Sequence, residues 1–405
     1  MLKFKKAVIL GLSIICAFGL IGCGDKSKEI ILSNDSKREL NAANNEYEFN
    51  KVKELSIDKN IEPLIWKDDN DFIAIDNVGT QYDIYNVNVN TSKLTLINTI
   101  NGQHISQWGD RDKLVYMQDG KFGIYDLKTN TSKVIYGLED IEKEINESNY
   151  VPNKDNSYSS AVSLGLVKGS DKYMYIVDKY SNDKNGTLFR IIDLETGKVI
   201  VKSTPAAEIN PYMFFYSKYN NSIYTQIFWG IKDGVAVSGI YQYKLEKPQV
   251  PSKVEKLNFI TDMTKDGKII YTVNSTENGI LRYDMQNDKL TEVTNLRDRD
   301  GLSNTESLRY PTVNLSSTDN FIYYGEEKSS IGSNKSSRST YIGYVNGDKI
   351  SGVRRIPIEE LGTPAFGNIV FDAKDNRFIF KYYYSDGSNG PLKYKYYIYE
   401  IKKGL

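Results

Sequence analysis

The 405-residue chain repeats one short pattern seven times after Tyr47. In each copy an apolar segment ends in a tight polar turn, and a second apolar segment follows at once. The copies occupy residues 64–75, 106–117, 165–176, 214–225, 261–272, 313–324 and 370–381. Their turns are rich in Asp, Asn, Gly, Ser and Lys, which suit tight hairpins. Repetition of this kind indicates an architecture assembled from copies of one supersecondary unit.

Each copy continues into further strand-like segments. A third segment occupies residues 82–89, 122–129, 188–195, 239–246, 280–287, 341–348 and 394–401. A fourth follows a short turn in the first six copies, beginning for example at Lys93 and Lys133. Four antiparallel strands per repeat are typical of a β-propeller blade. The sequence therefore predicts an all-β, seven-bladed β-propeller over residues 47–405, with six or eight blades as the near alternatives.

The two ends of the repeat region complement each other. The seventh copy lacks a fourth strand because the chain ends at Leu405, whereas a surplus strand-like segment, residues 47–57, precedes the first copy. An open ring would expose an unpaired strand edge. We expect residues 47–57 to pair with residues 396–401 as the outer strand of the last blade. The one break in the all-β pattern is 138–148, where apolar residues at helical spacing predict a short surface helix.

One repeat resembles a known family. The segment KDGKIIYT (265–272) is similar to the core of the TolB/WD40-like propeller repeat, in which a Pro-Asp-Gly-Lys turn precedes an apolar strand. Lys265 stands where that repeat has Pro, and KDNRFIFK (374–381) is a more distant match. The Gly-His and Trp-Asp markers of WD40 proteins are absent. The resemblance implies the propeller fold and no particular activity.

The N-terminus reads as a secretory signal. Lys3, Lys5 and Lys6 precede an apolar run over residues 7–21, and the segment Leu20-Ile21-Gly22-Cys23 follows. A transmembrane anchor is the alternative, but the run is shorter than the ~20 residues that a membrane-spanning helix needs. The signal resembles that of bacterial lipoproteins. That resemblance implies cleavage before Cys23, diacylation of its thiol with fatty acids such as palmitate, and an anchor on the extracytoplasmic side of the cell membrane.

The division of the chain follows from these features. Residues 1–22 are expected to be a signal peptide, residues 23–46 the lipidated Cys and a polar, flexible tether, and residues 47–405 a propeller, monomeric as an ectodomain. A coil of the tether's length has a root-mean-square reach of ~25 Å.

Charge and composition exclude several functions. The chain has 52 basic and 52 acidic side chains, and loss of residues 1–22 leaves a formal charge of −3. Such a balance argues against nucleic-acid binding and against electrostatic adhesion to lipid, so the two acyl chains on Cys23 must hold the protein at the membrane. The single histidine, His104, excludes multi-histidine zinc motifs. No cofactor is expected, because nucleotide-binding motifs are absent.

Two acidic groupings invite a chemical interpretation. Glu62, Asp262 and Asp372 lie in or near the first strands of their repeats, where some propeller glycosidases place carboxylates ~5–9 Å apart; we expect them to be solvated strand ends. Asp298 and Asp300 precede Gly301 but lack the remaining ligands of a calcium loop. Turn chemistry explains them, and calcium there is the alternative.

Connection lengths suggest a binding face. In a propeller, first-to-second and third-to-fourth strand turns share one face, and here they are short. The long segments fall on the other face: 139–158, 178–187, 201–212, 226–238, 295–312, 325–339, 356–367 and 384–393. Long loops on a rigid scaffold often carry binding residues. The candidates are Tyr150, Tyr158, Tyr180, Trp229, Arg297, Arg299, Arg309 and Tyr310. The alternative is that exposed loops tolerate insertions without any function.

The expected function is that of an envelope binding or scaffold protein for a protein partner or a wall or environmental ligand. The competing class is a carboxylate-dependent glycan-processing enzyme.

Overall fold

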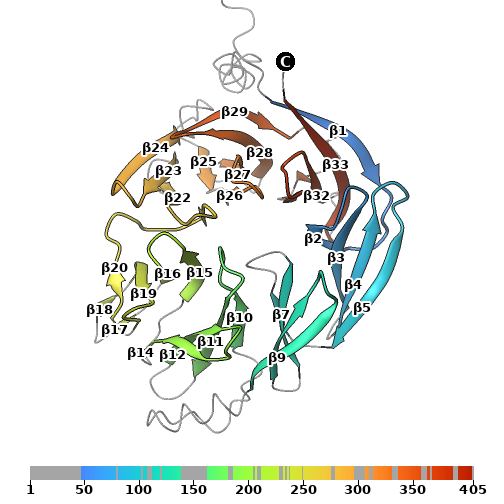
Figure 1. Ribbon diagram of the computed structural model, residues 1–405. Coiled ribbons are helices and arrows are strands. Elements are labelled where there is room, and N and C mark those ends of the chain that lie inside the picture. Colours follow the sequence, from blue (N-terminus) through green and yellow to red (C-terminus); the bar gives the residue numbers. More distant parts are fainter. Residues whose placement is uncertain are drawn as a thin grey trace, which may run out of the picture.

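The computed structural model describes residues 47–403 except 79–80, 102–103, 107–111, 119–120, 138–161, 181–185, 204–205, 208–210, 228–230, 233–234, 237, 249, 275–278, 296–305, 310–312, 331–335, 357–362, 365–366 and 386–390. These residues form seven antiparallel sheets arranged in a ring around a central opening (Figure 1). The predicted seven-bladed β-propeller is confirmed, and the six- and eight-bladed alternatives are excluded.

The blades follow the repeats in chain order. Blade 1 contains β2 (Glu62–Trp66), β3 (Asp71–Val78), β4 (Gln81–Asn88) and β5 (Leu94–Asn101). Blade 2 contains β6 (His104–Ser106), β7 (Lys113–Gln118), β8 (Lys121–Asp126) and β9 (Thr131–Gly137). Blade 3 contains β10 (Val162–Leu166), β11 (Tyr173–Tyr180), β12 (Gly186–Asp193) and β13 (Val199–Lys202), with β14 (Ala206–Ala207) beside β12. Blade 4 contains β15 (Pro211–Ser217), β16 (Ser222–Ile227), β19 (Gly239–Lys244) and β20 (Ser252–Lys253).

The last three blades continue this order. Blade 5 contains β21 (Asp262–Met263), β22 (Ile269–Asn274), β23 (Gly279–Asp284) and β24 (Lys289–Asn295). Blade 6 contains β26 (Val313–Leu315), β27 (Phe321–Ser330), β28 (Ser336–Asn346) and β29 (Lys349–Arg355), and blade 7 contains β31 (Asn368–Phe371), β32 (Arg377–Ser385), β33 (Lys393–Lys403) and β1 (Tyr47–Leu55). The short strands β25 (Glu306–Arg309) and β30 (Thr363–Pro364) extend blades 6 and 7, and β17 (Ile231–Lys232) and β18 (Val235–Ala236) form a separate hairpin.

The N-terminal strand closes the ring as expected. β1 pairs antiparallel with β33, from Tyr47 opposite Lys403 to Leu55 opposite Tyr396. The edge of blade 7 is thereby covered, and a strand from the start of the chain completes a sheet from its end (Figure 1). Closure removes the exposed edge that an open ring would offer to other chains.

The core is divided among the blade interfaces. The described residues form seven apolar clusters, one between each pair of neighbouring blades. Along β3, Phe72 and Ala74 face blade 7, while Ile73 and Ile75 face blade 2. A strand buried on both sides has a continuous apolar sequence rather than an alternating one. This explains the apolar runs of the repeats.

Turns on one face interlock between blades. The turns between first and second strands and between third and fourth strands lie on this face, which we call the short-turn face. Asp319, at φ 63°, accepts a hydrogen bond from Lys265 N of the preceding blade at 2.7 Å. Gly267, at φ 72°, occupies the corresponding turn of blade 5, where a Cβ would lie 2.6 Å from Lys218 N. Contacts of this kind brace neighbouring blades against each other.

The opposite face, here the long-loop face, carries the second-to-third strand turns and the connections between blades. The interpretation of 178–187, 325–339 and 384–393 as loops was partly wrong, because β11, β12, β27, β28, β32 and β33 extend into them. The helix expected at 138–148 lies outside the described residues. The part of the chain that the structure describes contains no helix long and apolar enough to cross a membrane. The division at residues 22 and 46 stays a prediction.

Candidate functional site

Ring closure brings the first and last blades together at an interface that we call the seam. Its middle is apolar: Trp66 and Phe72 of blade 1 pack in one cluster with Val370 and Ile379 of blade 7. Polar networks lie at both ends of this apolar layer. The two ends differ in exposure and in chemistry, and this difference decides which of them is a candidate site.

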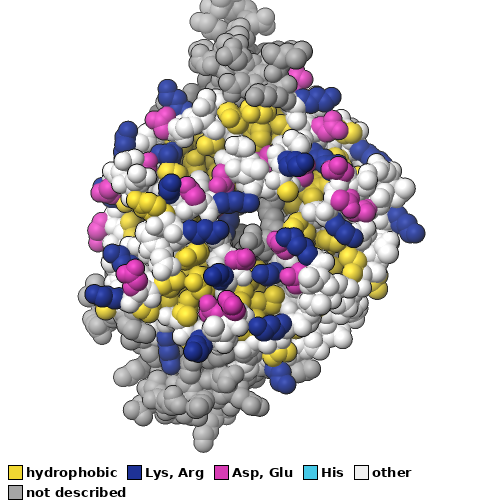
Figure 2. All heavy atoms as spheres, viewed as in Figure 1, with side chains coloured by type: hydrophobic (Ala, Val, Ile, Leu, Met, Phe, Trp, Pro, Cys, Tyr) yellow, Lys and Arg dark blue, Asp and Glu magenta, His cyan; other side chains and the backbone are white. Residues whose placement is uncertain are grey.

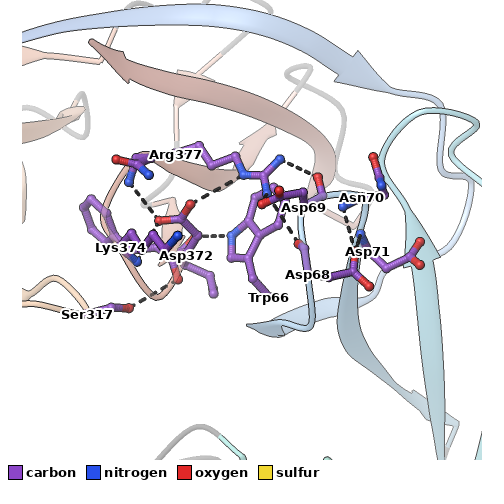
Figure 3. A network of polar contacts seen from close by, with 12 residues as sticks. Trp66, Asp68, Asp69, Asn70, Asp71, Ser317, Asp372, Lys374 and Arg377 are labelled. Carbon is purple, nitrogen blue, oxygen red and sulfur yellow. Dashed lines mark hydrogen bonds and ion pairs between the residues drawn. The ribbon is translucent and has the colours of Figure 1, made fainter. Parts of the chain in front are cut away.

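The short-turn end of the seam is held by Arg377. Its guanidinium carbon lies 4.3 Å from the centroid of the Trp66 ring, and Nη2 lies 2.7 Å from Asp69 Oδ1 (Figure 3). Arg377 Nη1 also donates to the carbonyl oxygen of Asp69, and Trp66 Nε1 donates to Val370 O at 3.0 Å. The Asp69 side chain is 97% exposed. A solvent-exposed ion pair contributes little free energy, and every contact of this network joins blade 1 to blade 7. We therefore assign it to holding these two blades together.

The long-loop end carries four residues that we call the seam cluster: Glu62, Asn368, Lys381 and Tyr383. Glu62 opens the innermost strand of blade 1, and the other three belong to blade 7. Lys381 Nζ lies 2.9 Å from Glu62 Oε2, and Tyr383 Oη donates to the same oxygen at 3.2 Å. Asn368 Nδ2 donates to Glu62 Oε1. One carboxylate thus gathers three donors across the seam.

Lys381 is the least accessible member of the cluster. It is 2% exposed, and Nζ lies 4.6 Å from the ring centroid of Tyr383 and 5.8 Å from that of Tyr396. Burial lowers the pKa of Lys381, and the charge of Glu62 opposes that shift. Burial, reinforced by the same carboxylate, raises the pKa of Tyr383. The Glu62 side chain is 24% exposed, so the cluster meets solvent through its carboxylate.

Four other blades carry no charge at the position of Lys381. The corresponding second-strand positions of blades 1, 2, 3 and 5, which face the next blade, carry Ile75, Met117, Val177 and Val273, all in apolar clusters. Replacing a buried ion pair with apolar residues of similar volume is often neutral or stabilising. Because these four blades pack with apolar side chains at that position, packing alone does not explain the lysine of blade 7.

Further polar groups lie beside the seam cluster. Lys59 Nζ donates to Tyr85 Oη at 2.7 Å and lies 3.5 Å from Asp76 Oδ2, and the hydrogen bond with Tyr85 raises the pKa of Lys59. Asp83 accepts hydrogen bonds from Gln81, Tyr85 and Thr99, and the amide of Gln81 makes the largest contribution to lowering its pKa. The backbone of Lys59 joins the two groups, because Tyr396 Oη donates to Lys59 O at 3.0 Å.

The structure gives each of the other two inner-strand carboxylates a structural partner. Asp262 accepts hydrogen bonds from Met263 N and Leu315 N, both at 2.7 Å, and pairs with Lys168 at 2.9 Å. Asp372 accepts from two backbone amides of its own turn. They are 2% and 9% exposed, so the expectation of solvated strand ends was wrong for both. The three acids do not form one group.

The sequence-based binding candidates are only partly located. Tyr180 ends β11 and Arg309 ends β25, and their side chains are not among those described. Tyr150, Tyr158, Trp229, Arg297, Arg299 and Tyr310 lie outside the described residues, as do Cys23, Asp298 and Asp300. His104 begins β6. In the described ranges, His, Cys, Asp and Glu side chains form no group of three or more that could hold a metal.

Lys381 was missed at the sequence level although a signal was present. It interrupts an apolar and aromatic run, Phe378 to Tyr384, in a strand that the repeat predicts to be buried. Lysine is almost never fully buried without a partner. A charged residue in such a run therefore predicts a paired group inside the ring.

Comparison with known proteins supports the fold. No protein-family model matches the sequence, and no curated protein matches it either. Among solved structures the chain is similar to an oligogalacturonate lyase in complex with manganese, with a TM-score of 0.50, 14% identity, and coverage of 88% of this chain and 96% of that one.

Two other solved structures score lower. An acylaminoacyl peptidase from Pyrococcus horikoshii has a TM-score of 0.47 and 14% identity over 84% of this chain, which spans 51% of the peptidase. The β-propeller domain of the Trilobed protease from Pyrococcus furiosus has a TM-score of 0.46 and 14% identity, covering 82% of this chain and 96% of that one. At 14% identity the likeness to the lyase shows a shared fold alone, and nothing further is drawn from the two lower-scoring structures.

Proposed function

We propose that this protein is a lipid-anchored, extracytoplasmic β-propeller that binds a protein partner through its long-loop face. The lipoprotein-like signal ending at Cys23 supports the anchor. The closed ring supports a scaffold role, because interlocked turns leave the other face to carry the long connections. The seam cluster is the described part of that binding face.

The Lys381–Glu62 pair carries the proposal. It places a buried lysine where four other blades have apolar residues, and it joins that lysine to a partly exposed carboxylate on the long-loop face. At specific interfaces most of the binding energy comes from a few residues near the centre of the contact. Glu62 is held by three donors, and Lys381 behind it lies over two tyrosine rings, so the carboxylate has the fixed position that such a residue needs.

The test compares the two ends of the seam. In the double variant Glu62→Gln/Lys381→Met both charges are removed with little change in volume, so the fold is expected to survive. The matched control, Arg377→Met, breaks the ion pair at the short-turn end. Wild-type lipoprotein and both variants are used to recover partners from solubilised membranes, and melting temperatures are measured in parallel.

We expect the Glu62/Lys381 variant to recover at least tenfold less partner than wild type, and Arg377→Met to recover as much. If the two variants recover the same amount of partner and have similar melting temperatures, the assignment of the binding face is overturned. Loss of partner only in Arg377→Met would move the binding surface to the short-turn face.

A second candidate, carboxylate-dependent glycan processing, rests on Glu62 alone, which is an inner-strand carboxylate with a partly exposed side chain. Cleavage of wall polysaccharide by the wild type, lost in the single variant Glu62→Gln, would favour this enzyme function. No cleavage by the wild type would leave the binding function as the proposal.

A further inference from the structure

The point at which the chain enters the ring lies on the short-turn side. Tyr47 pairs with Lys403, and the neighbouring Ile401 donates to Asn376 O in the first-to-second strand turn of blade 7. At its other end β1 reaches the long-loop side, because Leu55 pairs with Tyr396, which in turn lies opposite Lys381 of the seam cluster.

Aromatic contacts fix this entry point on the body of the ring. The Tyr47 ring lies 5.0 Å from that of Phe321 and 4.6 Å from that of Tyr344, both in blade 6. Phe49 lies 6.0 Å from Phe321 and 6.3 Å from Phe378. The start of β1 is thereby packed against two blades, so Tyr47 has a defined position on the short-turn rim.

We infer that the short-turn face is turned toward the membrane and that the long-loop face points away from it. This inference rests on the proposed lipid anchor at Cys23. The nine residues of β1 span about 30 Å between the two rims. That distance exceeds the ~25 Å root-mean-square reach of the tether that the sequence predicts. A tether attached at the short-turn rim therefore favours the orientation in which the short-turn face lies closest to the membrane.

Surface charge does not oppose this orientation. Lysines on the short turns stand beside acids: Lys67 with Asp68, and Lys265 with Asp266. Figure 2 likewise shows side chains of both signs gathered around the central opening. The described side chains of the short turns thus form no charge field of one sign that would repel this face from the lipid or draw it there, so the attachment point is left to set the orientation. The seam cluster is then accessible to a soluble or wall-side protein that approaches from the side away from the bilayer.

The test places one fluorophore on either face. Cys16 and Cys23 are the only cysteines, so an introduced thiol is unique once residues 1–22 have been cleaved off and Cys23 is lipidated. Lys265→Cys marks the short-turn face, and Val78→Cys, at a 54% exposed position that ends β3, marks the long-loop face. The full-length lipoprotein carrying either label is reconstituted into phosphatidylcholine vesicles that contain a quencher lipid.

A second arm separates orientation from lipidation. Residues 24–405 with an N-terminal histidine tag are bound to nickel-chelating lipid in the same vesicles, which supplies an anchor whatever the state of Cys23. The ring observed over residues 47–403 includes every strand that closes the propeller. Absence of the native protein from vesicles would refute the anchor proposal, while the tagged protein would still decide the orientation.

We expect at least twofold stronger quenching of the label at residue 265 than at residue 78 in both arms, with the difference lost when a long Gly/Ser insert extends the tether. Equal quenching with the natural tether, or stronger quenching at residue 78, would overturn the inference. A preference that requires phosphatidylglycerol in the vesicles and disappears at high salt would also overturn it, because charge rather than the tether would then set the orientation.

Discussion

Removal of β1 should cost the ring most of its stability, whereas removal of the segment before it should cost almost nothing. We compare two truncations of the ectodomain, one lacking residues 24–45 and one lacking residues 24–58. The first deletes only the tether that the sequence predicts. The second also deletes β1, which pairs with β33 over the length of the strand.

The magnitude follows from the side chains that β1 buries. Leu55 and Ile57 are 4% and 8% exposed in the seam core, and Tyr47 and Phe49 pack against the cluster between blades 6 and 7. Full burial of a side chain of this size contributes about 1.5–3 kcal/mol, so Leu55 and Ile57 together contribute about 3–6 kcal/mol, and the partly buried Tyr47 and Phe49 add to this. A typical domain has a total stability of about 5–15 kcal/mol. The longer truncation should therefore unfold or aggregate at temperatures where the shorter one is native.

The measurement is thermal unfolding by circular dichroism, with light scattering to detect association through the exposed edge of β33. A point variant gives an intermediate step: Leu55→Ala should lose about 2–5 kcal/mol and melt between the two truncations. If both truncations melt at the same temperature, β1 does not stabilise the ring and the account of closure fails.

Three further predictions concern anchoring, metal content and pH. Cys23→Ser should abolish incorporation of a tagged fatty acid, and equal labelling would refute the lipoprotein reading. The purified ectodomain should contain no stoichiometric zinc and keep its fold on chelation; elemental analysis finding one zinc per chain would contradict this. Burial raises the pKa of Asp319 to about 6, so the folded state binds this proton more tightly than the unfolded state does. The stabilisation that results is complete below pH ~4 and is lost as the pH rises through about 6. Asp319→Asn, which keeps an acceptor for Lys265 N, should therefore raise the melting temperature at pH 7.5 but not at pH 4; an equal effect at both values would contradict the shift.

The fold could be predicted from the sequence because the ring is built from local units. Each first-to-second strand hairpin is signalled by its own turn residues, such as Asp266-Gly267, and by apolar segments on both sides. The closing strand was predicted because an extra strand-like segment precedes the first repeat and the last repeat lacks its fourth strand. The pairing of Tyr47 with Lys403 confirms it. The long connections were predicted less well. Whether a polar segment such as 325–330 continues a strand depends on its partner in β28, which has no local signal.

The seam cluster could not be assembled from the sequence, because its members are brought together only by ring closure. Glu62 and Lys381 lie at opposite ends of the chain, and nothing near either residue indicates the other. The repeat does place Lys381 at a buried position, but it does not say which of the neighbouring carboxylates will pair with it. That choice depends on blade 1 being the neighbour of blade 7.

The acidic residues on the inner strands of this protein have different roles, and their hydrogen-bond partners between the blades explain why. Asp262 accepts from Leu315 N, a backbone donor that would otherwise be buried without a partner, so its removal would cost stability. Lys381 and Glu62 satisfy each other instead, and their joint replacement with neutral residues leaves no backbone group unpaired. A polar residue that satisfies a backbone group is required by the fold, whereas a charged pair whose partners are all side chains can be replaced without leaving the backbone unsatisfied. By this criterion Asp262 is a structural residue. The charges of the seam cluster are not needed to satisfy the backbone, which is why we assign the binding function to this cluster among the described residues.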